Sequence, residues 1–166
     1  MKDKKVLFLV QSAAIAAIYV VLTMLFAPFG FGEIQVRVSE ALTILPYFTP
    51  AAVPGLFVGC LIGNTLGGAI PLDIAVGSLA TLIGAVCTYS LRRHSRWLAP
   101  LPPIVANALL VPFVLSYGYG VPLPIPVMML TVGIGEVLSC GVMGMVILLS
   151  LEKYRGAIFR QAVNGR

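Results

Sequence analysis

The basic segment Arg92-Arg-His-Ser-Arg96 separates two long apolar parts of the chain and decides how the protein is organised. Every other Lys or Arg residue except Arg37 lies near one end of the chain. Cytoplasmic loops of membrane proteins carry the excess of Lys and Arg. The pattern predicts a membrane protein with both termini and the 92–96 loop in the cytoplasm, and with an even number of spans on each side of that loop.

The composition supports a membrane protein, because 59% of the 166 residues are hydrophobic and only 10% are charged, too little polar surface for a soluble domain. Nucleic-acid binding is not expected, since the positive charge sits in loops and forms no long basic run. Cys60, Cys87 and Cys140 are isolated and are interpreted as small packing residues, with no disulfide or metal site indicated. The first apolar run is too long for a typical signal peptide, which favours a span.

Apolar runs between proline and loop signals predict six spans, because a helix needs about 20 residues to cross the bilayer. The expected spans lie at about 6–27, 36–49, 51–70, 71–91, 102–119 and 127–151. An alternative makes 36–70 one span plus a re-entrant segment, but it leaves an odd number of spans before the basic loop. We therefore predict an all-α bundle of six transmembrane helices in one domain, residues 1–166.

Small residues recur at helical spacing on two of these spans. Glycines at 55, 59, 63 and 67 give the third span a smooth face for close packing. Packing inside the protein is the favoured interpretation, and dimerisation is the alternative. Ala13 and Ala17 form a second small-residue face, on the first span.

Polar residues from distant segments converge on the outer half of the predicted bundle. Buried charges cost about 2.5–3.5 kcal/mol each on insertion scales, and usually pair or serve a site. Arg37 can balance one acid, most simply Glu40 or Glu136, and the remaining acids suit a ligand with a cationic amine or several N–H donors. The candidate ligand-binding residues are Gln35, Arg37, Glu40, Asn64, Asp73, Asn107, Tyr117 and Glu136.

Structural roles compete for most of these residues. Asp73 suits a helix N-terminus, and Arg37 with Glu40 is spaced for a pair within one helix. Gln35 suits a solvated loop, and Asn107 suits an interhelical hydrogen bond nearer the cytoplasm. Glu136 is the strongest candidate, because it stands in an apolar run with no local partner.

Motifs for chemistry are absent from the sequence. It contains no phosphate-binding loop of the Gly-x-x-x-x-Gly-Lys-Ser/Thr type, no His-Glu-x-x-His and no Gly-x-Ser-x-Gly. We therefore expect no enzyme, no cofactor and no metal, and a capture subunit that depends on a partner for energy.

Several short motifs follow one another along the chain: Ile34-Gln-Val-Arg-Val-Ser-Glu-Ala-Leu-Thr43, Gly63-Asn64 with Asp73 and Gly77, Ala106-Asn107-Ala108, and Gly135-Glu136. In this order they resemble the queuosine-precursor substrate-binding (S) components of energy-coupling factor transporters. The resemblance implies a six-helix protein in a prokaryotic plasma membrane that binds a deazapurine, expected to be 7-aminomethyl-7-deazaguanine. It also implies a transmembrane coupling subunit, docked on Ala13 and Ala17, and two ABC ATPases that use the ATP.

Two other function classes stay open at this point. One is a self-sufficient small-solute transporter or channel, formed as a homodimer through the glycine face of the third span. The other is an intramembrane enzyme that uses Glu136 or Asp73 as acid or base. Ligand binding without ATPases, and co-purification with a coupling subunit, would separate both from the S-component interpretation.

Overall fold

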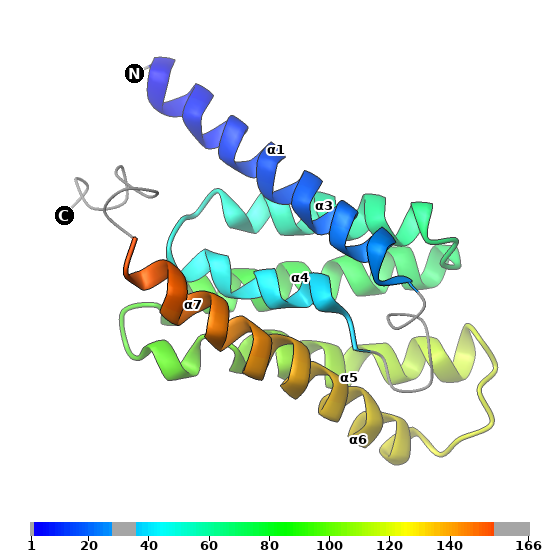
Figure 1. Ribbon diagram of the computed structural model, residues 1–166. Helices are drawn as coiled ribbons and strands as arrows, with labels where there is room; N and C mark the ends of the chain where they lie inside the picture. Colours follow the sequence, from blue (N-terminus) through cyan, green and yellow to red (C-terminus); the bar gives the residue numbers. More distant parts are fainter. Residues whose placement is uncertain (1, 28–35, 155–166) are drawn as a thin grey trace.

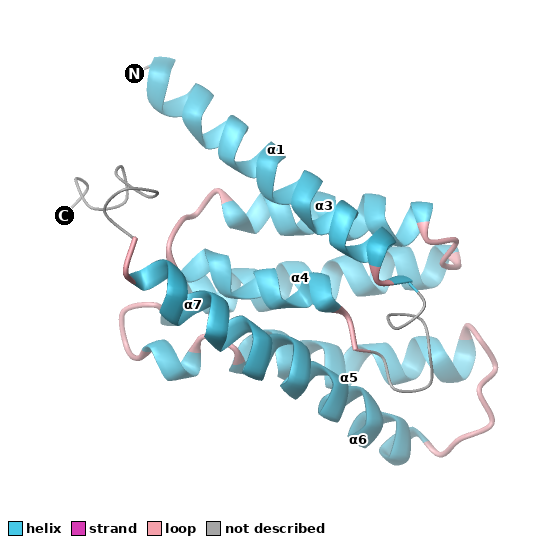
Figure 2. Cartoon of the chain, in the orientation of Figure 1, coloured by secondary structure: helices cyan, strands magenta, loops and turns pink. Residues whose placement is uncertain are grey.

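The computed structural model describes residues 2–27 and 36–154, and these residues form helices joined by short loops (Figures 1 and 2). Four helices are long and apolar enough to cross a membrane, namely Lys4–Leu25, Pro71–Leu91, Arg96–Tyr117 and Ile125–Glu152, and Ala52–Leu66 is a shorter apolar helix. The elements are α1 (Lys2–Leu25), the 3-10 helix η1 (Val38–Tyr47), α3 (Ala52–Leu66), α4 (Pro71–Leu91), the 3-10 turn η2 (Arg96–Leu98), α5 (Leu101–Tyr117), α6 (Ile125–Glu136), the π-helix η3 (Val137–Met143) and α7 (Gly144–Glu152).

Prolines set several helix boundaries where the sequence predicted them. A proline stands in the first turn of α4, α5 and α6, where its missing N–H costs no helical hydrogen bond. The predicted fourth span, 71–91, coincides with α4. The predicted sixth span corresponds to α6, η3 and α7, which follow one another without a break.

The two ends of the bundle differ in the way that the basic residues predicted. Figure 1 shows the N-terminus of α1, the loop before α5 and the C-terminal end of α7 at one end of the molecule. Arg96 and Glu152 form an ion pair there, with Nη1 and Oε2 2.9 Å apart. The connections between α3 and α4 and between α5 and α6 lie at the opposite end. The basic loop and both ends of the described chain therefore share one side.

The segment predicted as the second span is much shorter than a membrane crossing. It is the 10-residue 3-10 helix η1, and all of its residues from Ser39 to Pro46 are buried. It packs against α1, α3, α4, α7 and η3, so protein rather than lipid surrounds most of it. This explains why it tolerates Glu40 and Pro46, which lipid-facing helices avoid.

The glycine face of α3 packs inside the molecule, as the sequence favoured. A Cβ added at Gly55 would lie 2.7 Å from the Ser12 carbonyl oxygen, and one at Gly59 would lie 2.8 Å from Tyr19 Cβ. The glycines therefore let the backbones of α1 and α3 approach closely. Ala13 and Ala17 lie on another side of α1 and are exposed.

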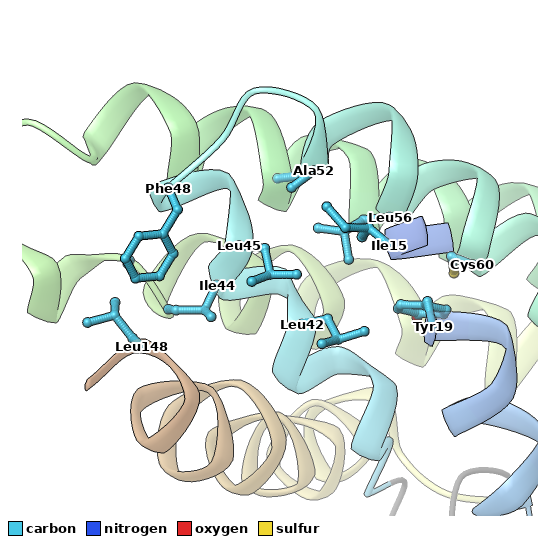
Figure 3. Packing of buried hydrophobic residues seen from close by; sticks show 12 residues of the cluster. Ile15, Tyr19, Leu42, Ile44, Leu45, Phe48, Ala52, Leu56, Cys60 and Leu148 are labelled. Carbon is cyan, nitrogen blue, oxygen red and sulfur yellow. The ribbon is translucent and has the colours of Figure 1, made fainter. Parts of the chain in front are cut away.

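An apolar core fills the space around η1 (Figure 3). Figure 3 shows Phe48 and Leu148 at one end of this core and Tyr19 and Cys60 at the other. The side chain of Leu42 lies between these ends. Polar groups begin beyond Tyr19 and Cys60, so the core supports one side of the site described below.

Substitution of Gly59 by alanine is expected to destabilise the protein. The added Cβ would push Tyr19 away from α3, and overpacking of this kind costs about 1–3 kcal/mol. Thermal unfolding in detergent, followed by tryptophan fluorescence or gel filtration, measures the effect. Gly133→Ala is the matched control, because its Cβ would meet only Ala108 Cβ at an ordinary 3.8 Å. Equal unfolding temperatures for the two variants would contradict the tight α1–α3 contact.

Candidate functional site

Buried polar side chains from seven elements gather toward the end of the bundle that lies opposite the basic loop. Their exposed fractions are 8% or less, although the outer surface of the bundle is apolar. Burying so many polar groups is costly unless they pair with one another or with a ligand. We call this set the polar cluster; it comprises Tyr19, Arg37, Glu40, Thr43, Asn64, Asp73, Asn107, Glu136 and Cys140.

The outer part of the cluster is built around Arg37 and Asp73. Arg37 Nη2 lies 3.8 Å from Asp73 Oδ2, and its Nη1 donates to Asn64 Oδ1 at 3.5 Å. The hydroxyl of Tyr119 also donates to Asp73 Oδ2, at 2.9 Å. Burial raises the pKa of Tyr119, so its phenol stays protonated and remains a donor near neutral pH. The ion pair described for Arg37 is thus with Asp73, and not with Glu40 or Glu136 as the sequence suggested.

A glycine makes room for this arrangement. A Cβ added at Gly77 would lie 3.1 Å from Asn64 Nδ2 and 3.4 Å from Asp73 Oδ1. The first distance is tighter than ordinary packing, so a side chain at this position would crowd the Asn64 amide. Gly77 therefore belongs to the wall of the site, although it carries no polar group.

The inner part of the cluster holds two glutamates. Tyr19 donates a hydrogen bond to Glu40 Oε1, and the Cys140 thiol donates to Glu136 Oε2 at 3.1 Å. Thr43 Oγ1 lies 3.3 Å from Cys140 Sγ and joins η1 to η3. Side-chain atoms of Glu40, Glu136 and Cys140 lie within 4.8 Å of one another.

A small cation could fit between these three groups only after the thiol lost its proton. In the structure the thiol keeps that proton and donates a hydrogen bond to Glu136. Thr43 contacts the same sulfur. The arrangement fits a hydrogen-bonded network better than a metal centre.

Non-α backbone positions the two glutamates. Glu40 lies on the 10-residue 3-10 helix η1, which is long for this type of helix. Glu136 immediately precedes the seven-residue π-helix η3, which contains Cys140. The two irregular segments pack against each other, and π-helical segments are frequent at functional sites. The irregular backbone of η1 and η3 thus lies at the same position in the fold as the polar cluster.

Several buried polar atoms make no hydrogen bond within the part of the chain that the structure describes. They include Glu40 Oε2, Asp73 Oδ1 and Asn107 Nδ2. Asn107 approaches Glu136 without completing a bond of ordinary geometry. A buried polar group without a partner costs about 1–3 kcal/mol, so these atoms are available to a polar ligand.

The structure brings together six of the eight predicted site residues. Arg37, Glu40, Asn64, Asp73, Asn107 and Glu136 all belong to the polar cluster. Gln35 lies outside the described residues. Tyr117 is 77% exposed at the end of α5, so the structure does not bring it to the others, and Tyr119 contacts Asp73 instead. The predicted role of Tyr117 as a ligand-binding residue stays a prediction.

Sequence reasoning missed three members of the cluster. Tyr19 and Thr43 lie in apolar runs and give no signal of their own until their helix faces are known. Cys140 was interpreted as a packing residue, yet it contacts both Thr43 and Glu136. Its spacing of four residues from Glu136 was a usable signal, because residues four apart share one face of a helix.

Comparisons with known proteins point to one family. A family model described as QueT transporter matches residues 9–153. The curated protein "Queuosine precursor transporter QueT" of Lactococcus lactis subsp. cremoris (strain MG1363) is 38% identical over 85 residues, which make up 50% of each chain. The match thus spans about half the length of that relative. No solved structure gives a significant match.

Proposed function

This chain belongs to the QueT transporter family, and on that premise we propose that it captures a queuosine precursor outside the cell for import. The proposed ligand is 7-aminomethyl-7-deazaguanine. We further propose that the chain is the substrate-binding (S) component of an energy-coupling factor transporter and folds as one six-helix domain.

One observation carries the proposal for the ligand. The polar cluster holds three carboxyl groups but only one guanidinium group among the described residues, and all four groups are buried. A ligand with an ammonium group and guanine-like N–H donors would supply the positive charge and the donors that these acids lack. A neutral apolar ligand would leave them unmatched.

Each cluster residue takes a role in this proposal. Glu136 and Glu40 accept hydrogen bonds from the ring N–H donors or pair with the ammonium. The Asn64 amide forms hydrogen bonds with a polar edge of the ring. Arg37 orients Asp73 and does not contact a cationic ligand, since like charges repel. Asn107 is placed beside Glu136, and Gln35 and Tyr117 remain proposed contacts from the outer end.

The proposed energy source is a partner complex. We propose a transmembrane coupling subunit and two ABC ATPases, with ATP used only by the ATPases and no cofactor on this chain. The exposed Ala13 and Ala17 on α1 support a docking surface, because small side chains let another helix approach closely.

The alternatives have less support. The glycine face that would join a homodimeric channel is covered by α1 in the structure. A transporter also needs no acid–base catalyst, so Glu136 and Asp73 are proposed as binding groups and not as catalytic ones.

The proposal is tested with the isolated protein in detergent. Calorimetry should show saturable binding of 7-aminomethyl-7-deazaguanine without any ATPase present. Guanine, which lacks the ammonium, is the comparison ligand and should bind more weakly. Co-purification with a coupling subunit from the native membrane tests the second part. Absence of binding would refute the proposed ligand, whereas ligand binding with no coupling subunit co-purifying from the native membrane would refute only the S-component role.

We also propose that both termini lie in the cytoplasm of a prokaryotic cell. Cysteine placed at Val121, in a variant without native cysteines, should react with an impermeant reagent added outside intact cells. Cysteine placed at His94 is the matched control at the other end of the bundle and should be protected. Labelling at position 94 from outside would reverse the orientation.

A further inference from the structure

Glu40 and Glu136 are two acids of the polar cluster that lie close together. Their side-chain atoms approach within 4.8 Å, and the residues are 1% and 3% exposed. Glu40 accepts from Tyr19 through Oε1, while its Oε2 has no hydrogen bond within the described part of the chain. One buried carboxyl oxygen is therefore available next to a second carboxyl group.

The charges around this pair do not offset two negative groups. Arg37 is the one cation of the polar cluster, and its ion pair with Asp73 spans 3.8 Å. A single guanidinium can balance one of the three carboxylates. The other groups that face the pair are neutral donors or thiols at neutral pH: Tyr19 on α1, Cys60 on α3, Thr81 on α4, Asn107 on α5 and Cys140 on η3.

Two buried carboxylates this close repel each other strongly, and such pairs usually keep one proton between them. If both glutamates were ionised, the three carboxylates and the Arg37 guanidinium would give the cluster a net charge of −2. One retained proton reduces this net charge to −1. A ligand with one positive charge would reduce the net negative charge by the same amount as the proton. The proton and a cationic ligand therefore compete for the same position beside the two carboxyl groups.

We propose that Glu40 and Glu136 share one proton in the ligand-free protein and release it when a positively charged ligand binds. The proposal rests on the proposed function, because it specifies how that same site selects its ligand. No covalent bond changes: the proton passes to water, and the ammonium group takes its place beside the carboxylates. The pair would thus select cationic over neutral forms of one ring system.

Two consequences are measurable. A cationic ligand should bind more tightly as pH rises through the range in which the pair holds its proton, by about tenfold per pH unit for one released proton. A neutral ligand of the same shape should show no such dependence, because it gains nothing from a second ionised carboxylate. The sign follows from linkage, since binding a cation requires the proton-free pair.

Calorimetry at each pH in two buffers that both buffer at that pH but differ in ionisation enthalpy counts the protons released per ligand bound. The cationic probe is 7-aminomethyl-7-deazaguanine, and the neutral probe is 7-methyl-7-deazaguanine, the same ring without the ammonium. Between pH 5.5 and 8, we expect proton release approaching one per site for the cationic probe at its maximum and none for the neutral probe. Glu136→Gln and Glu40→Gln should each abolish the release, and Glu152→Gln should not.

The outcomes separate this proposal from the proposed function. If both probes bind without releasing a proton across this pH range, the retained proton is refuted and the ligand assignment stands. If both probes release the same non-zero number of protons, the competition between the proton and the ammonium group is refuted. If neither probe binds to the folded protein, the proposed function fails, and this proposal fails with it. The comparison of the two probes uses the unmodified protein, so it decides the matter even if the glutamine variants do not fold.

Discussion

Ala13→Trp and Ala17→Trp are each expected to abolish uptake of the queuosine precursor while leaving ligand binding by the isolated protein intact. Both alanines are exposed on one side of α1, whereas Tyr19 and Ala16 face the glycines of α3. A bulky ring at an exposed position does not disturb that internal contact, but it prevents a partner helix from approaching closely. Uptake of labelled precursor by cells, and calorimetry on purified protein, measure the two effects separately.

Ile18→Trp is the matched control for these variants. Ile18 is 52% exposed and lies one residue along the same helix from Ala17, which turns it about 100° away from that face. It should retain uptake. Loss of ligand binding together with uptake in the alanine variants would mean that the face packs internally, and equal loss in Ile18→Trp would mean that the alanine face has no special role.

Glu136→Gln is expected to weaken binding of 7-aminomethyl-7-deazaguanine by roughly ten- to a hundredfold. The substitution keeps the shape of the side chain and removes its charge, and a hydrogen bond to a charged group contributes about 1.5–3 kcal/mol. Glu136 is 3% exposed and accepts from Cys140, so no water-exposed group compensates for the loss. Calorimetry near neutral pH gives the affinity directly.

The control is Glu152→Gln, the same change at the far end of the same continuous helix. Glu152 pairs with Arg96 near the basic loop, so its loss should leave ligand affinity unchanged. Unaltered affinity in Glu136→Gln, with an unfolding temperature like that of the unmodified protein, would return Glu136 to a structural role.

Much of the fold was predictable because hydropathy and proline placement act locally. The fourth span was predicted closely, from just after Pro71 to about residue 91, since Pro71 stands at its start and Arg92 follows it. The segment 36–49 was not, because its environment is made by helices that are distant in sequence. Apolar composition shows that a segment avoids water, but it does not distinguish contact with lipid from contact with protein.

Most residues of the site could be predicted from the sequence, but which of them contact one another could not. Polar residues in apolar runs can be recognised from the sequence as candidate site residues, because burial of charge is costly and needs a reason. Which acid meets Arg37 depends on helix rotation, and the structure describes its ion pair with Asp73 at a sequence separation of 36 residues. The exposure of Tyr117 depends on the same rotation, at the last residue of α5.

The enclosure of η1 by other helices has a consequence for how the chain is made. A helix of ten residues that contains Glu40 and directly follows Arg37 is a poor candidate for insertion on its own, because each charge adds about 2.5–3.5 kcal/mol. Its final neighbours include Cys140, which contacts the Glu40 carbonyl oxygen across 100 residues of sequence. Synthesis must therefore reach the last helix before η1 can be fully enclosed. The polar cluster is completed only at the end of biogenesis, and a chain truncated before Val137 would lack the contacts of Cys140 with Glu40 and Glu136.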